Sequence, residues 1–149
     1  MIVLIFGQPN SGKTTLAQSL IASMKKRFAW HNVHNVDGDS VRNLYADNDF
    51  SKEGRINNLK RISDISLYIN KAKYDTTIIS SVYPYEQSRE YLRQLCLRSD
   101  VTFLSVYLTY DEPRGREVYH VKDFEVPTTS MTPAVPIKKL VVSIPVVTA

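Results

Sequence analysis

The chain has 149 residues, 43% of them hydrophobic, and a formal net charge of +4 from 19 basic and 15 acidic residues. This length suits one compact domain with a buried core and leaves no room for a second domain of ordinary size. The mild positive charge is compatible with binding of anionic small molecules and with weak nucleic-acid affinity. The single cysteine, Cys96, excludes a disulfide framework. It falls in a segment with apolar residues at helical spacing, which favours a buried packing role.

The first predicted elements are a buried strand over residues 1–6 and a helix over residues 13–28. The strand is a continuous apolar run, and Leu16, Leu20 and Met24 recur at helical spacing after it. The loop between them satisfies every position of the pattern G-x-x-x-x-G-K-S/T, with Gly7, Gln8, Pro9, Asn10, Ser11, Gly12, Lys13 and Thr14. Strand, loop and helix follow in the order that a phosphate-binding loop requires, so the sequence predicts a nucleoside triphosphate site.

The residue types of this loop explain how it would hold ATP. Gly7 and Gly12 allow the backbone to curl with its NH groups pointing inward, and the following helix adds its positive N-terminus. Lys13 would neutralise charge on the β- and γ-phosphates, and the Thr14 hydroxyl would ligate the Mg²⁺ that bridges them. We therefore predict that the loop, with Thr15 after it, binds ATP, and that ATP and Mg²⁺ are the cofactors.

Strand-like and helix-like segments alternate along the chain up to residue 108. Beyond the first pair, we predict strands at 33–36, 76–82 and 101–108 and helices at 51–72 and 85–98. This alternation is typical of an α/β fold, here a three-layer α/β/α P-loop NTPase with a mainly parallel sheet. Ligands of such sheets bind at the carboxyl ends of the strands, so the side chains that follow each strand are the functional candidates.

An acidic pair follows the second predicted strand, where Asp37 and Asp39 flank Gly38. Alone, this pattern is more typical of an ordinary turn and helix cap than of a catalytic pair. A kinase, however, needs a carboxylate near the γ-phosphate to hold the metal and to accept the proton of the acceptor hydroxyl. We predict Asp37 and Asp39 as catalytic residues together with Lys13, and Asp39 as a metal ligand together with Thr14.

The next informative segment opens the long helix at 51–72. Ser51 is a helix-cap residue, and Arg55, Asn58 and Ile62 step by three and four residues, so one helix face begins polar near the strand ends and turns apolar. Such a face suits the wall of a cleft. A solvated first turn with arginine ion pairs is the alternative.

The order of these motifs resembles the adenylylsulfate kinases, which use ATP to phosphorylate the ribose 3′-hydroxyl of adenosine 5′-phosphosulfate. The match covers residues 1–108 and consists of GxxxxGKT, DGDxxR, FSxxxRxxNxxR and PYxxxR. The resemblance implies that Asp37 and Asp39 serve the metal and the acceptor hydroxyl, that Phe50 stacks on the adenine, and that Arg42, Arg55 and Asn58 hold the phosphosulfate and its nucleoside. Forked arginine donors suit such a dianion, and an aromatic face suits a purine.

We therefore expect a kinase domain over residues 1–125 that makes 3′-phosphoadenosine 5′-phosphosulfate. Two alternatives stay open: a P-loop kinase for another hydroxyl, on a small alcohol or a polynucleotide 5′ end, and a nucleotide-binding module with weak catalysis. The expected partner is a small-molecule nucleotide, with homodimer formation left open and neither nucleic acid nor membrane expected. No secretory segment precedes the loop and no apolar stretch reaches membrane-span length, so we expect a cytoplasmic protein.

The chain departs from the family pattern in two regions. Tyr83 stands where the family has a serine, so a phosphoserine intermediate is not available there, and Glu86 stands where a basic residue commonly follows. The family's lid is shortened to residues 109–120. Arg114 and Arg116 in this segment are either partial substitutes for the basic residues of the family's lid or part of a charged surface turn. Because lids exclude water and bring late charge to the transferring phosphate, the shortening predicts slow catalysis, loss of phosphate to hydrolysis, or dependence on another subunit.

Residues 126–149 form a proline- and valine-rich C-terminal tail. They contain four prolines and a β-prone run at 140–144, so helix is excluded for most of the segment. We expect the tail to be an edge strand or an extended arm.

Overall fold

The computed structural model describes the chain except for residues 28, 30–31, 111–120, 128–139, 144–145 and 148–149. Within the described residues, one sheet has six strands: β1 (Ile2–Phe6), β2 (Val33–Asp37), β3 (Thr76–Ser80), β4 (Phe103–Tyr110), β5 (Leu140–Ser143) and β6 (Val146–Val147). The strand order is β2-β3-β1-β4-β5, and β6 also pairs with β4. The first four strands are parallel, whereas β5 and β6 run antiparallel to β4. The sheet is therefore mainly parallel, as predicted.

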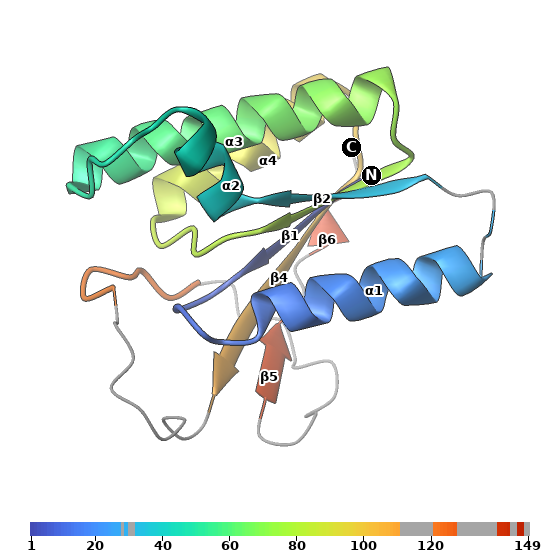
Figure 1. The fold of residues 1–149 in the computed structure, drawn as a ribbon, viewed down its shortest axis with the longest axis horizontal. Coiled ribbons are helices and arrows are strands. Elements are labelled where there is room, and N and C mark those ends of the chain that lie inside the picture. The colour runs from blue at the N-terminus through green and yellow to red at the C-terminus, as the bar shows by residue number, and fades with distance from the viewer. Residues whose placement is uncertain (28, 30–31, 111–120, 128–139, 144–145, 148–149) are drawn as a thin grey trace.

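Helices cover both faces of this sheet (Figure 1). One face carries α1 (Lys13–Arg27), and the other carries α2 (Gly38–Leu44), α3 (Lys52–Ala72) and α4 (Glu86–Arg98). The side chains of β1 alternate between the two layers: Ile2, Leu4 and Phe6 pack with the α3 and α4 side, and Val3 and Ile5 pack with the α1 side. Burial on both faces explains why this strand reads as a continuous apolar run, and the predicted three-layer α/β/α fold is confirmed.

The elements differ from the sequence-based prediction in three places, one of which is the strand predicted at 101–108: it lies at Phe103–Tyr110. The acidic pair is followed by a helix, α2, whose N-cap is Asp37: its Oδ2 accepts hydrogen bonds from the backbone N and the Oγ of Ser40, each at 3.0 Å. A seven-residue helix is too short to show an apolar period in the sequence. The third strand ends at Ser80 rather than at residue 82, because the backbone leaves the sheet to place Tyr83 at a φ of +43°.

The long helix α3 begins where its cap predicts. The Ser51 Oγ accepts a hydrogen bond from the Gly54 backbone N at 3.1 Å and donates one to Asp49 Oδ1 at 2.6 Å. Gly54 lies directly against Asp49, and a Cβ at this position would collide with it. The first turn of α3 is thus held against the preceding loop, which places the polar end of the helix near the carboxyl ends of the strands.

Part of the predicted tail joins the sheet. Both β5 and β6 lie within residues 126–149, and their partner is β4, the last parallel strand. In the part of the chain that the structure describes, no helix is both long and apolar enough to cross a bilayer.

Candidate functional site

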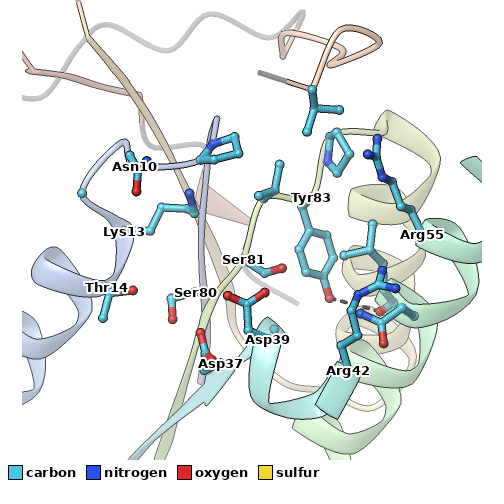
Figure 2. Close-up of a pocket in the computed structure, with 18 of the residues that line it drawn as sticks. Asn10, Lys13, Thr14, Asp37, Asp39, Arg42, Arg55, Ser80, Ser81 and Tyr83 are labelled. Atoms are coloured by element: carbon cyan, nitrogen blue, oxygen red, sulfur yellow. Dashed lines mark hydrogen bonds between the residues drawn. The ribbon is translucent and has the colours of Figure 1, made fainter. Parts of the chain in front are cut away.

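A pocket of about 620 Å³ opens at the carboxyl ends of the parallel strands, between the loop that precedes α1 and the first turns of α2 and α3. Figure 2 shows Lys13 and Thr14 on one side of it, Asp37 and Asp39 in the middle, and Arg42 and Arg55 on the other. Twelve of the predicted site residues line the pocket: Pro9, Asn10, Gly12, Lys13, Thr14, Thr15, Asp37, Asp39, Arg42, Phe50, Arg55 and Asn58. Residues from four segments of the chain thus meet in one cavity, as the strand-end argument predicts.

The other three predicted loop residues shape the loop and do not line the pocket. Gly7 has a φ of +157°, and a Cβ there would collide with the Leu108 carbonyl, so no larger residue fits. Ser11 is buried, and its Oγ accepts a hydrogen bond from Lys13 Nζ at 3.3 Å. The Gln8 backbone carbonyl accepts a second hydrogen bond from Lys13 Nζ at 2.8 Å. The Gln8 side chain accepts a hydrogen bond from the Val121 backbone N at 2.9 Å and donates one to the Val121 carbonyl at 3.1 Å.

Lys13 brings a partly buried ammonium to this pocket. Burial lowers the pKa of its ammonium to about 8, and the Asp39 carboxylate across the pocket opposes that shift. A partly desolvated ammonium favours an incoming anion because the anion replaces the lost hydration. The Lys13 environment is therefore suited to phosphate oxygens.

The two aspartates of the acidic pair differ in their surroundings. Asp37 is engaged as the cap of α2 through Ser40. Asp39 lies in the first turn of that helix, and in Figure 2 its carboxylate points into the space between Lys13 and Arg42. Among the two predicted catalytic carboxylates, Asp39 has the better orientation toward a reacting group.

Arg42 and Phe50 form a stacked pair at the rim. The Arg42 guanidinium lies over the Phe50 ring, 4.4 Å from its centroid, and donates a hydrogen bond to the Asp49 carbonyl at 3.0 Å. Arg42 also forms an ion pair with Asp47 at 3.6 Å. The Phe50 side chain is 60% exposed, which is unusual for a large aromatic residue and is consistent with a stacking platform.

Arg55 and Asn58 lie on the α3 wall. Arg55 forms an ion pair with Asp123 at 3.7 Å, and the Tyr85 hydroxyl donates to the same Asp123 carboxylate at 2.8 Å. Asn58 is buried, and its Oδ1 has no hydrogen-bond partner among the described residues. An unpaired buried carbonyl in a pocket wall is the kind of atom that a ligand donor satisfies.

Several pocket residues were not among the predicted site residues. Ser80 ends β3 and Ser81 follows it, and the strand-end rule pointed to this segment. Tyr83 and Val121 also line the cavity. Val121 had no sequence signal, because it reaches the pocket only through the pairing of its backbone with Gln8. The shortened lid, with Arg114 and Arg116, lies outside the described residues.

Comparisons with known proteins agree with this geometry. The family model for adenylylsulphate kinase matches residues 1–119. A probable adenylyl-sulfate kinase of Aeropyrum pernix is 33% identical over 110 residues, which are 72% of this chain and 58% of that protein. An adenylyl-sulfate kinase of Pseudomonas entomophila is 33% identical over 113 residues, which are 72% of this chain and 52% of that protein.

A solved structure shares the fold. The Mycobacterium tuberculosis APS kinase CysC in complex with AMPPNP and APS has a TM-score of 0.65 and 23% identity, covering 71% of this chain and 60% of that one. The chain spans little more than half the length of the two curated relatives.

Proposed function

Because this chain belongs to the adenylylsulfate kinase family, we propose that it is an ATP-dependent kinase that phosphorylates the 3′-hydroxyl of adenosine 5′-phosphosulfate. The observation that carries this proposal is the single pocket in which Lys13 and Thr14 face Asp39, with Arg42 and Arg55 beyond it. A donor site and an acceptor site on either side of one carboxylate are what a phosphoryl transfer to an alcohol requires.

The donor side fits ATP and Mg²⁺ by the chemistry of its groups. The loop before α1 supplies inward-facing backbone, and Lys13 supplies a partly buried ammonium for the β- and γ-phosphates. The described residues contain no cluster of three His, Cys, Asp or Glu side chains that would hold a metal alone. We propose that Thr14 and Asp39 bind Mg²⁺ together with phosphate oxygens, the mode that Mg²⁺ prefers in nucleotide sites; when bound, the ion would neutralise phosphate charge.

The acceptor side fits a sulfated adenine nucleotide. Phe50, already backed by Arg42 on one side, offers an aromatic surface for the base. Arg42 and Arg55 supply positive charge for the phosphosulfate, and the unpaired Asn58 Oδ1 supplies an acceptor for a nucleoside donor group. An anionic acceptor would exchange with Asp123 for the Arg55 guanidinium, because their ion pair is long and half-exposed.

Catalysis would consist mostly of positioning and charge neutralisation. Asp39 would accept the proton of the ribose 3′-hydroxyl while the oxygen of that hydroxyl forms a bond to the γ-phosphorus. The bond from that phosphorus to the bridging oxygen of ATP breaks, and ADP leaves with the bond's electron pair. Lys13 would stabilise the charge that develops on the transferred group and on the leaving β-phosphate.

The test is product formation from ATP, Mg²⁺ and adenosine 5′-phosphosulfate, followed by chromatography of the nucleotides. We expect 3′-phosphorylated product with the native chain and a loss of rate of about 100-fold or more in both Lys13→Ala and Asp39→Asn, because each removes a group on which the phosphoryl transfer step depends. Asp100→Asn, which changes an exposed carboxylate after α4, is the matched control and should keep the native rate.

Other outcomes point to the alternatives. Absence of product from adenosine 5′-phosphosulfate, together with turnover of a polynucleotide 5′-hydroxyl or a small alcohol, would assign a different acceptor. Tight ATP binding without product from any acceptor would assign a nucleotide-binding module. Undiminished product with Asp39→Asn would refute the proposed role of that carboxylate.

A further inference from the structure

Tyr83 is a buried tyrosine that forms part of the pocket wall. Its side chain is fully buried, and its backbone adopts a φ of +43°, a left-handed conformation that is uncommon for a large residue. Figure 2 shows it between the strand end that carries Ser81 and the helix that carries Arg55. A strained backbone with a fully buried aromatic ring indicates that the surrounding structure holds this residue firmly in place.

The Tyr83 hydroxyl is bonded to the middle of α3. It lies 2.8 Å from Ser63 Oγ and donates to the Leu59 carbonyl at 3.2 Å, while Ser63 Oγ itself donates to Leu59 at 2.8 Å. The Leu59 carbonyl and the Ser63 hydroxyl belong to one turn of α3. The tyrosine therefore connects the loop after β3 to the helix that forms the acceptor wall.

The other end of Tyr83 is held as well. Its carbonyl accepts a hydrogen bond from Arg89 Nη1 of α4 at 2.7 Å, and Arg89 is itself buried. Tyr83 thus spans from α4 to α3 beneath the pocket. Because both ends are hydrogen-bonded to buried groups, the distance between the strand end and α3 is fixed by a single side chain.

The residue that depends most directly on this arrangement is Asn58. It precedes Leu59 in the same turn of α3, it is buried, and its Oδ1 is unpaired among the described residues. A rotation of this turn would move that oxygen out of reach of a bound nucleoside. Lys13, Thr14 and the donor loop lie across the pocket and do not contact the Tyr83 hydroxyl.

We propose that Tyr83 is a positioning residue for the acceptor side of the pocket: its hydroxyl holds the Leu59–Ser63 turn of α3 and thereby sets the place of the Asn58 amide. This inference rests on the proposed kinase function for the identity of the acceptor. The hydroxyl is not itself a phosphate carrier, because it is buried and already bonded within α3; burial raises the pKa of Tyr83 far above its ordinary value and keeps the group protonated.

The experiment compares Tyr83→Phe with the native chain. We expect the KM for adenosine 5′-phosphosulfate to rise about fivefold, the size of effect that a lost orienting hydrogen bond produces, while the KM for ATP stays within about twofold. The same rise in the KM for ATP, or no change in either KM, would overturn the proposal. The phenyl ring keeps the core filled, so the variant isolates the hydroxyl.

Tyr91→Phe is the matched control. The Tyr91 hydroxyl also bonds to α3, at Asp64 Oδ1 and 2.6 Å, but it is exposed and does not line the pocket. Removing it should leave both KM values unchanged. If Tyr91→Phe raises the acceptor KM as much as Tyr83→Phe does, the effect comes from general loosening of α3 and the proposal fails.

Two further measurements keep the inference separable from the proposed function. If the native chain makes no 3′-phosphorylated product, the proposed function fails. Amide hydrogen exchange of α3, measured without nucleotide, then tests the positioning role of Tyr83. Faster exchange at residues 58–63 in Tyr83→Phe supports that role, and unchanged exchange refutes it. If Tyr83→Phe does not fold, Ser63→Ala replaces it. That variant removes the hydroxyl's side-chain partner and should raise the acceptor KM in the same direction.

Discussion

The two residues of the acidic pair, Asp37 and Asp39, have different surroundings in the structure. Asp37 caps α2 through Ser40, whereas Asp39, two positions later, faces Lys13 across the pocket. The sequence left a turn and cap open as an alternative to a catalytic pair, and the structure contains a cap at Asp37 while both residues line the cavity. Their catalytic and metal-binding roles stay predictions.

Cys96 carries a prediction at the same scale. The thiol is fully buried, as expected from its helical spacing, and burial raises its pKa to about 11 from an ordinary value of 9.0. We expect the native protein to resist an aromatic disulfide reagent at pH 8 and the urea-unfolded chain to react at once, as followed by absorbance. Rapid labelling of the native protein would contradict this burial.

The same shift predicts a pH dependence of stability. The folded pKa lies above the unfolded value, so between about pH 9 and pH 11 the unfolded chain has lost the thiol proton and the folded chain retains it. Over that window, the contribution of Cys96 to the free energy of unfolding falls as pH rises. Replacement by alanine should remove this part of the pH dependence in urea titrations.

At the scale of elements, the start of α3 depends on one hydroxyl. Ser51 Oγ accepts a hydrogen bond from the Gly54 backbone N and donates one to Asp49. The hydrogen bonds that the Ser51 hydroxyl and backbone N donate to Asp49 lower the pKa of its carboxyl. We expect Ser51→Ala to lower the free energy of unfolding by about 1 kcal/mol, the usual loss for a helix N-cap. Urea unfolding followed by circular dichroism measures it.

The control for this prediction is Ser99→Ala. Ser99 is the C-cap of α4 and takes part through its backbone N, so the loss of its hydroxyl should leave the unfolding midpoint almost unchanged. Equal losses from the two variants would show that the Ser51 cap adds nothing beyond a generic serine replacement.

At the scale of the whole molecule, Arg89 connects segments that are far apart in the sequence. It donates to the Tyr83 carbonyl and to the Glu125 carbonyl, each at 2.7 Å, and its guanidinium lies over the rings of Phe6 and Phe124. One side chain thus holds the first strand, the loop after β3 and the segment that precedes the tail. Phe124 and Glu125 accordingly take part in packing and do not line the pocket.

We expect Arg89→Met to lower the free energy of unfolding by about 3 kcal/mol, because a buried carbonyl, that of Tyr83, and a partly buried one, that of Glu125, lose a charged donor. Arg93→Met is its control on the same helix. Arg93 pairs with the partly exposed Glu90, and the loss of such a surface pair should cost less than about 1 kcal/mol. Similar losses in urea titrations of the two variants would contradict a connecting role for Arg89.

Gln8 joins the loop before α1 to the same late segment through Val121, 113 positions away. Tyr85 and Arg55 hold that segment through Asp123. The division into residues 1–125 and 126–149, the cytoplasmic location and homodimer formation stay predictions.

The sequence by itself determined the elements whose signals are local. The glycine loop with its flanking strand and helix, the Ser51 cap and the parallel α/β alternation all follow from short-range backbone sterics, hydrogen bonding and apolar period. Tertiary structure alone decided what long-range packing controls: the buried span of Tyr83 from α4 to α3, the place of Val121 at the pocket, and the ion pair of Arg55 with Asp123. The physical reason is that these contacts join segments whose separation in sequence carries no periodic or compositional trace, so their energies exist only once the sheet has formed.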